Sequence, residues 1–179
     1  SGGLLKVVPE QDAKLQTGTS YFFNTRGVDK AGNFQTVIST LQFTFDATPP
    51  ITGLSTPLAG GFYRPSDLGA LGGTAFDYPA GAAGVSYNME DATSGRWFEA
   101  VGSTFSLAAE PAPWPGNLVG GAWDTSIGLP AFTFLDGHTY RFRKLGRDLV
   151  NNVEASTTPL SSFLVDFSTP STTIQTTSG

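Results

Sequence analysis

The chain contains no cysteine and only one histidine, His138, and these two shortages narrow the chemistry available to it. Without thiols there is neither a disulfide framework nor a thiolate metal site. A hydrolytic enzyme needs a nucleophile, a base and a stabilising group, or paired carboxylates in a cleft, whereas His138 falls in a predicted turn, where we expect it to be exposed. The carboxylates of Glu90 and Asp91 point to opposite sides of a predicted strand, which does not suit acid and base work on one bond. The sequence therefore predicts no enzyme.

Positive charge and long apolar runs are also scarce. Lys and Arg number 10 against 15 Asp and Glu, which gives a formal net charge of −5. Such a surface repels a phosphate backbone, so nucleic acid is not an expected partner. No stretch approaches the ~20 apolar residues of a membrane span, and Ser1-Gly2-Gly3 does not begin a signal peptide. We expect no membrane span in this fragment and any targeting signal or anchor outside it.

The most informative feature present is an internal repeat. The pattern Leu-x-x-Gly-x-x-Tyr-x-Phe-x-x-x-Gly-x-Asp-x-x-x-Asn begins at Leu15, and it returns at Phe134 with phenylalanine in the first position. The offset is 119 residues, because Tyr140 matches Tyr21. After one extra residue the match continues, with residues 43–50 (FTFDATPP) followed at 163–170 by FLVDFSTP. A fixed period of this kind is typical of stacked modules, so the chain is predicted to be a piece of a longer array.

The repeat divides the chain into three parts. Residues 1–48 are expected to be the C-terminal part of an upstream module, residues 49–168 a complete module, and residues 169–179 a linker or the start of the next module. Only the second part carries enough strands for a core of its own. The apolar faces of residues 1–48 therefore need a partner, either from the rest of an array or, by strand addition, from a neighbouring subunit.

The coarse pattern is all-β, with short aromatic and β-branched runs separated by Gly, Pro, Asn and Asp. Residues 21–45 are predicted to form a hairpin with Tyr21 and Phe23 toward the core. The complete module is predicted to be a β-sandwich. Its strands are expected near Ile51–Ser55, Leu71–Asp77, Gly84–Glu90, Arg96–Val101, Thr104–Ala108, Gly121–Thr125, Ala131–Leu135, Thr139–Arg147 and Leu160–Asp166.

Prolines shape two connecting segments. Pro49 and Pro50 end a short linker and are expected to restrict the angle between adjacent modules. Pro111, Pro113 and Pro115 lie in the insertion from 109 to 118, which we expect to be an irregular surface loop. That loop is either a variable binding surface or a plain insertion.

The turn and linker patterns resemble those of bacterial immunoglobulin-like and fibronectin type III-like repeats of large extracellular proteins. The residues that carry the resemblance are Leu15, Gly18, Tyr21, Asp29, Gly32, Asn33, Asp46, Thr48, Pro49 and Pro50. The second copy departs from the pattern at Asn151 and Thr169. The resemblance implies immunoglobulin-like sandwich modules in tandem, at a bacterial cell surface or otherwise extracellular. It also implies that Tyr21 and Tyr140 are tyrosine corners, whose hydroxyl groups bond to nearby backbone.

Acidic residues at the module junctions of some such proteins bind calcium, which is the one cofactor that the resemblance implies. It would place Asp29, Asn33 and Asp46 in one site, with Asp77 as a completing ligand. The equivalent set after the second module is Asp148, Asn152 and Asp166. Calcium takes about six to eight oxygen ligands, so the turn and linker would have to converge. The alternative is that these Asp and Asn side chains only cap their own turns.

Three tryptophans and one lysine complete the list of candidate residues. Trp97 and Trp123 lie in predicted strands and are expected in the core, whereas Trp114, on the proline-rich loop, is expected to be exposed and is the residue chosen for contact with a ligand such as a sugar. Lys144 should point inward by alternation, where an ammonium group needs a partner. A strand slip or a side chain that reaches back to solvent is favoured over an amide crosslink to an asparagine.

The function predicted from the sequence is structural. The chain is expected to be a tandem module of a bacterial stalk, adhesin or filament, with neighbouring modules or subunits as partners and surface glycans or proteins as further candidates. The alternative, from a different class, is a carbohydrate-binding or spacer module of a secreted enzyme. A spacer in a phage tail is not distinguished from a stalk by these residues.

Overall fold

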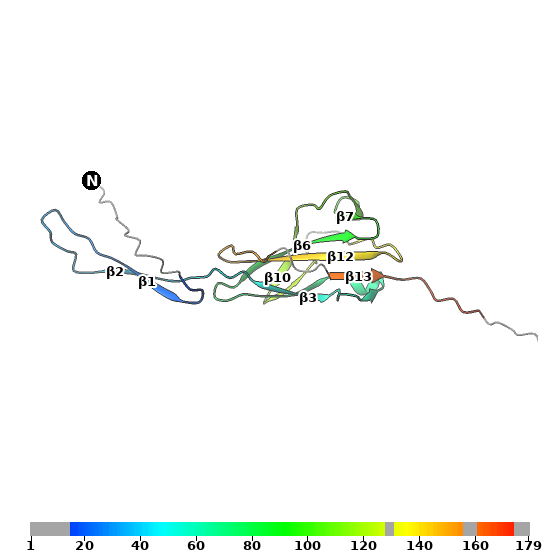
Figure 1. The fold of residues 1–179 in the computed structure, drawn as a ribbon, viewed down its shortest axis with the longest axis horizontal. Coiled ribbons are helices and arrows are strands. Elements are labelled where there is room, and N and C mark those ends of the chain that lie inside the picture. The colour runs from blue at the N-terminus through cyan, green and yellow to red at the C-terminus, as the bar shows by residue number, and fades with distance from the viewer. Residues whose placement is uncertain (1–14, 128–130, 156–160, 174–179) are drawn as a thin grey trace, which may run out of the picture.

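The structure, a computed structural model, describes residues 15–127, 131–155 and 161–173. Nearly all of its regular structure is β, as the sequence predicts. The one helix among these described residues is a 3₁₀ helix, Pro65–Leu68. Within that part no helix is long and apolar enough to cross a membrane. An N-terminal hairpin, residues 15–48, lies beyond one end of a layered body formed by residues 49–168 (Figure 1).

The body consists of two sheets. The smaller has the strand order β10 (Asn117–Val119), β11 (Ala122–Asp124), β5 (Gly72–Phe76) and β3 (Ile51–Thr56). The larger has the order β4 (Phe62–Tyr63), β13 (Ser161–Val165), β12 (Thr139–Asp148), β6 (Ala82–Asp91), β7 (Arg96–Glu99) and β8 (Thr104–Leu107), and β9 (Trp114–Pro115) also pairs with β6. All these pairings are antiparallel except β13 with β4.

Apolar side chains from both sheets meet between them. Trp123 of the smaller sheet stacks on Phe142 of the larger one, with ring centroids 6.0 Å apart, and Phe142 in turn stacks on Tyr87. Phe98, Phe105, Phe134 and Tyr140 extend this aromatic core. The layering is therefore sandwich-like, and the expected core position of Trp123 is confirmed. The same expectation for Trp97 is wrong, because Trp97 is only half-buried and packs under the guanidinium group of Arg143.

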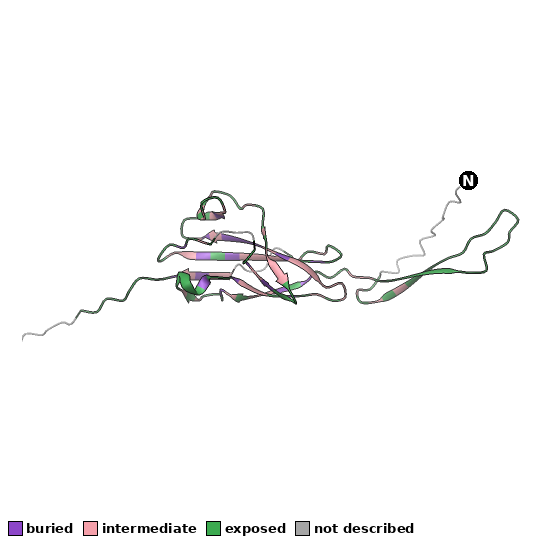
Figure 2. Ribbon diagram, turned by 180° about the vertical axis from the view of Figure 1, so that it is seen from behind, coloured by how far each residue is buried: buried purple, intermediate pink, exposed green. Residues whose placement is uncertain are grey.

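The N-terminal hairpin is built from β1 (Ser20–Thr25) and β2 (Ser39–Thr44), which pair only with each other in the part of the chain that the structure describes. Its register repeats that of β12 and β13, since Tyr21 faces Phe43 as Tyr140 faces Phe163. We call residues 134–168 the closing hairpin of the body; the structure describes it except for 156–160. The N-terminal hairpin is mostly exposed, whereas the inward-facing residues of the closing hairpin, such as Tyr140, Phe142 and Phe163, are buried. Figure 2 shows this difference in burial between the two hairpins.

Two predictions about secondary structure are wrong. Residues 131–135 form no strand. Phe132 and Phe134 both point inward, because their rings pack on Phe98 and Tyr140. The alternation of apolar residues in this segment therefore reflects packing against the core and not pairing with a neighbouring strand. The insertion from 109 to 118 is not wholly irregular either, because it contains β9 and the start of β10. Pro115 is accommodated there because β9 is a two-residue strand at a sheet margin.

Some predictions lie outside the described residues. These are the ends of the fragment at 1–14 and 174–179, and Leu160 at the start of the last predicted strand. That strand begins at Ser161 in the structure.

Candidate metal centre at the junction

The linker between the N-terminal hairpin and the body carries the first carboxylate of the candidate centre. Asp46 Oδ1 accepts hydrogen bonds from the backbone N–H and the hydroxyl of Thr48, at 3.0 and 2.9 Å. Its other oxygen, Oδ2, accepts the N–H of Ala80 at 3.1 Å, in the turn between β5 and β6. One side chain therefore both shapes the linker and ties it to the body. Burial opposes ionisation, but the bonds from Thr48 and Ala80 outweigh it and hold the pKa of Asp46 below its usual value.

The second carboxylate follows β5. Asp77 Oδ2 accepts the N–H of Gly81 at 2.9 Å, and Gly81 has a φ of +91°, a left-handed conformation that glycine adopts without a steric penalty. Burial raises the pKa of Asp77, and the negative charges of Asp46 and Asp148 raise it further. The ionised form of this group is thus disfavoured by its own neighbours.

The third carboxylate ends β12 and is fully buried. Asp148 Oδ1 accepts the N–H groups of Val150 and Asn152 at 2.9 and 2.7 Å, and Oδ2 accepts the side-chain amide of Asn152 at 2.7 Å. The same amide group of Asn152 lies 3.4 Å from the carbonyl oxygen of Asp46 and 3.3 Å from that of Thr48. Asn152 therefore connects the last turn of the body to the linker.

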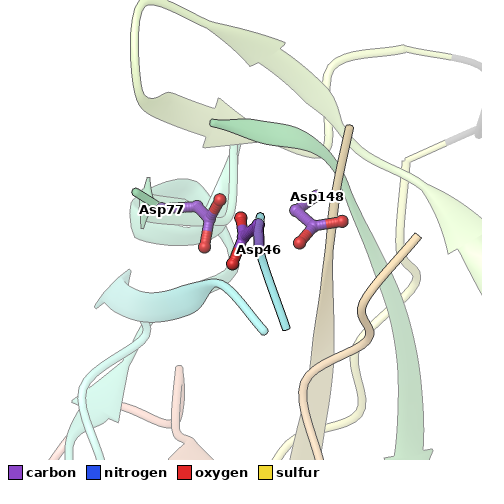
Figure 3. Close-up of side chains that lie close together, drawn as sticks. All are labelled: Asp46, Asp77 and Asp148. Carbon is purple, nitrogen blue, oxygen red and sulfur yellow. The ribbon is translucent and has the colours of Figure 1, made fainter. Parts of the chain in front are cut away.

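The three carboxylates converge, with one oxygen atom of each within 4.8 Å of the others (Figure 3). They come from the linker, from the turn after β5 and from the end of β12. Three carboxylates around one point form a ligand set for a hard divalent cation such as calcium, which prefers oxygen ligands. A cation there would neutralise the repulsion that raises the pKa of Asp77 and would join three segments that are distant in sequence.

The predicted ligand sets are regrouped by this geometry. Asp46 and Asp77 come from the first predicted set, but Asp148, which completes the cluster, comes from the second, as does Asn152, whose amide group donates to Asp148 and to the linker. Asp29 and Asn33 lie at the other end of the N-terminal hairpin. There Asp29 Oδ1 accepts the N–H groups of Ala31 and Asn33 and Oδ2 accepts the amide of Asn33. Those bonds hold the pKa of Asp29 below its usual value, with the side-chain bond from Asn33 as the largest cause.

Strand length explains the regrouping. β12 contains 10 residues and so spans about 33 Å, which places Asp148 and the start of β12 at opposite ends of the body. β13 runs back along it, so Asp166 lies at the far end from Asp148. Asp166 makes the same local turn as Asp46, since its Oδ1 accepts the N–H and the hydroxyl of Ser168 at 3.1 and 2.9 Å. The repeat placed Asp148 and Asp166 in one predicted set, and the antiparallel strands separate them.

The expected tyrosine bonds are present. Tyr21 accepts the N–H of Gln16 at 2.8 Å, and Tyr140 accepts that of Leu135 at 2.7 Å. Burial raises the pKa of the Tyr140 hydroxyl to about 12. In the linker, Pro50 is buried, whereas Pro49 is exposed.

Two exposure predictions are wrong. Trp114 is half-buried and packs against the core, and its indole N–H is buried without a hydrogen-bond partner among the described residues. It lies inside because β9 pairs with β6 at Tyr87. His138 is also not a free turn residue, because its Nδ1 lies 2.9 Å from Oδ2 of the buried Asp91.

Lys144 points inward, as alternation predicts, and it finds partners there. Its ammonium group donates to the carbonyl and hydroxyl oxygens of Thr52, both at 2.6 Å, and lies 3.6 Å from Glu154. Thr52 also hydrogen-bonds to the Glu154 carboxylate. Neither a strand slip nor an asparagine partner is involved. Glu154 was not identified from the sequence as the partner of Lys144, although Glu154 matches Gln35 at the offset of the repeat.

No family model and no curated protein sequence matches the chain. The fold itself defines an all-β protein with sandwich-like layers, and the candidate centre belongs to its linker end.

Proposed function

We propose that this chain is a structural spacer, a tandem immunoglobulin-like module of an extracellular bacterial stalk, adhesin or filament, whose junction is stiffened by calcium. The observation that carries the proposal is the position of Asp46. It belongs to the linker, yet its carboxylate lies with Asp77 and Asp148 of the body. A cation bound by all three would restrain the angle between the hairpin unit and the body.

The described residues favour this role over the carbohydrate-binding alternative. A sugar platform needs an exposed aromatic face. Trp114, the residue chosen for that contact, packs against the core instead, and Trp123 is 2% exposed. A spacer, by contrast, needs a rigid body, a short linker and a means of limiting bending.

Thermal unfolding of the chain in millimolar calcium and in excess chelator tests the proposal. A ligand bound only by the folded state stabilises it by about 2.7 kcal/mol at roughly 100 times its Kd. We expect the melting temperature to rise in calcium, and we expect Asp46→Asn and Asp148→Asn to abolish the rise.

The repeat supplies matched controls. Asp166→Asn and Asp29→Asn change the same local turns at positions outside the cluster of Asp46, Asp77 and Asp148, so the calcium response should persist in both variants. An equal melting temperature with and without calcium in the unaltered chain would refute the cation part of the proposal. A rise that survives Asp46→Asn and Asp148→Asn would place the calcium elsewhere.

A further inference from the structure

One face of the N-terminal hairpin is apolar and uncovered. By strand alternation this inner face carries Tyr21 and Phe23 from β1 and Leu41 and Phe43 from β2, followed by Phe45. Phe23, Leu41 and Phe43 are 46%, 64% and 41% exposed. A two-stranded hairpin is at best marginally stable alone in water, and a large exposed apolar patch marks a surface that binds something. The question is which partner fits it.

The closing hairpin of the body indicates the partner, because it has the same local structure as the N-terminal hairpin but its inner face is covered. The N–H of Gly18 donates to the carbonyl oxygen of Phe45, as the N–H of Gly137 donates to that of Val165. The N–H of Phe45 in turn donates to Thr19, as that of Val165 donates to His138. The turns also agree, since Asp29 and Asn33 are bonded through backbone and side chains as Asp148 and Asn152 are. Asn151, which replaces Gly32, takes the same left-handed conformation, with φ of 72° against 91°.

In the closing hairpin the inner face is sealed by the rest of the body. Tyr140, Phe142 and Phe163 are at most 1% exposed. Phe142 lies between Tyr87 of β6 and Trp123 of β11. The same strand also fills an edge, since β12 pairs antiparallel with β6 from Tyr140↔Asp91 to Asp148↔Ala82. The corresponding edge of β1 has no partner strand among the described residues.

Gly27 gives an independent indication that something approaches the hairpin closely. Its counterpart Gly146 cannot carry a side chain, because a Cβ there would lie 2.7 Å from Thr52 and 2.9 Å from Pro50. A Cβ at Gly27 would meet only the side chain of Gln35, at 3.1 Å, and the φ of Gly27 is not left-handed. Within the described structure, a Cβ at Gly27 would therefore require only a small shift of the Gln35 side chain. A partner that approaches as Thr52 and Pro50 approach Gly146 would require glycine at this position.

The nearly buried ion pair of the closing hairpin differs from the N-terminal hairpin at both of its positions. Lys144 and Glu154 of the closing hairpin correspond to Thr25 and Gln35 of the N-terminal hairpin. Gln35 keeps the local role of Glu154, because its Oε1 accepts the N–H of Gly27 at 3.1 Å as the Glu154 carboxylate accepts that of Gly146. A charged pair has thus been replaced by a neutral pair, which is consistent with both positions facing a common buried site.

We propose that the N-terminal hairpin completes a second β-sandwich body. That body has the strands that residues 49–133 supply here, but it has no closing hairpin of its own. Its acceptor strand pairs with the free edge of β1 as β6 pairs with β12, and its opposite sheet covers Phe23 and Phe43 with aromatic side chains. This deepens the proposed function and rests on its tandem arrangement, but it does not use the cation. A second intact copy of this chain is not the partner, because its slot is already filled by β12 and β13.

The test is a chimera of the full chain in which residues 134–168 are replaced by a second copy of residues 15–48. The body then keeps Trp97, Trp114 and Trp123 as probes of its core. If the hairpin fits such a slot, the chimera unfolds in one cooperative thermal transition, and its tryptophan emission resembles that of the unaltered chain. A second chimera carries Thr25→Lys and Gln35→Glu in the inserted copy, which restores the ion pair to Thr52.

Substitutions in the inserted copy separate specific docking from nonspecific collapse. Phe43→Asp on the inner face should abolish the cooperative transition, whereas Phe22→Asp on the outer face should leave it in place. The proposal is overturned if neither chimera unfolds cooperatively, or if the inner-face and outer-face substitutions act alike. Because the calcium response is measured on the unaltered chain, failure of the chimeras leaves that result unaffected, and the reverse also holds.

Discussion

The N-terminal hairpin and the closing hairpin share their register, their turns and their tyrosine bonds, yet the inner face is exposed in the first and buried in the second. Local hydrogen bonds are therefore not what distinguishes them. The difference is the layer of aromatic side chains and the strand β6 that lie against the closing hairpin alone. A hairpin of this sequence has a defined shape, but most of its stabilisation has to come from the surface it covers.

The largest difference in the free energy of unfolding should come from removing the phenylalanine ring at equivalent positions of the two hairpins. Phe142 is 1% exposed between two rings, so Phe142→Ala should lower the free energy of unfolding by about 3–5 kcal/mol through lost burial and a cavity. Phe23→Ala changes the equivalent ring, which has no such cover in this chain, and should cost less than about 0.5 kcal/mol. Urea denaturation followed by tryptophan fluorescence measures both. Equal losses would mean that the N-terminal hairpin is packed in solution.

The ion pair should give the next largest effect. Lys144 and Glu154 are 11% and 14% exposed, and Lys144→Thr leaves a nearly buried carboxylate without its cation, at a cost of about 3 kcal/mol. Adding Glu154→Gln reproduces the neutral pair of the N-terminal hairpin and should recover part of the loss. A double-mutant cycle by urea denaturation, with Glu154→Gln alone as the third variant, checks this. If the double variant is less stable than Lys144→Thr, the two side chains are not coupled in the way the structure indicates.

The smallest effect concerns the pH dependence at the junction end of the closing hairpin. Because the folded-state pKa of Asp77 is raised, its contribution favours the folded state below the usual value of 3.8 and is lost as pH rises through the folded-state pKa. In chelator at neutral pH, Asp77→Asn should therefore stabilise the protein slightly, and the gain should vanish in acid. Melting temperatures from pH 3 to pH 7 measure it, with Asp166→Asn as the control. Destabilisation at neutral pH would show that the bond to Gly81 outweighs the repulsion.

The sequence by itself determined the all-β class, the N-terminal hairpin, and the inward face of β12, including Lys144. It also indicated the turn bonds of Asp29 and Asp148 and the hydroxyl bonds of Tyr21 and Tyr140. These features depend on side-chain alternation and on contacts between residues a few positions apart. Such interactions act the same way in both copies, which is why the repeat could be read without a fold.

Only the tertiary structure decided which turns meet and which side chains are covered. It joined Asp46 and Asp77 to Asp148 instead of to Asp29, gave Lys144 its partner Glu154, and packed Trp114 against the core. It also left Phe132 and Phe134 in the core without a strand around them. Strand length, antiparallel direction and the facing of two sheets set these contacts, and each joins segments that no local pattern relates. The same reason explains why two hairpins of one sequence pattern have such different surroundings.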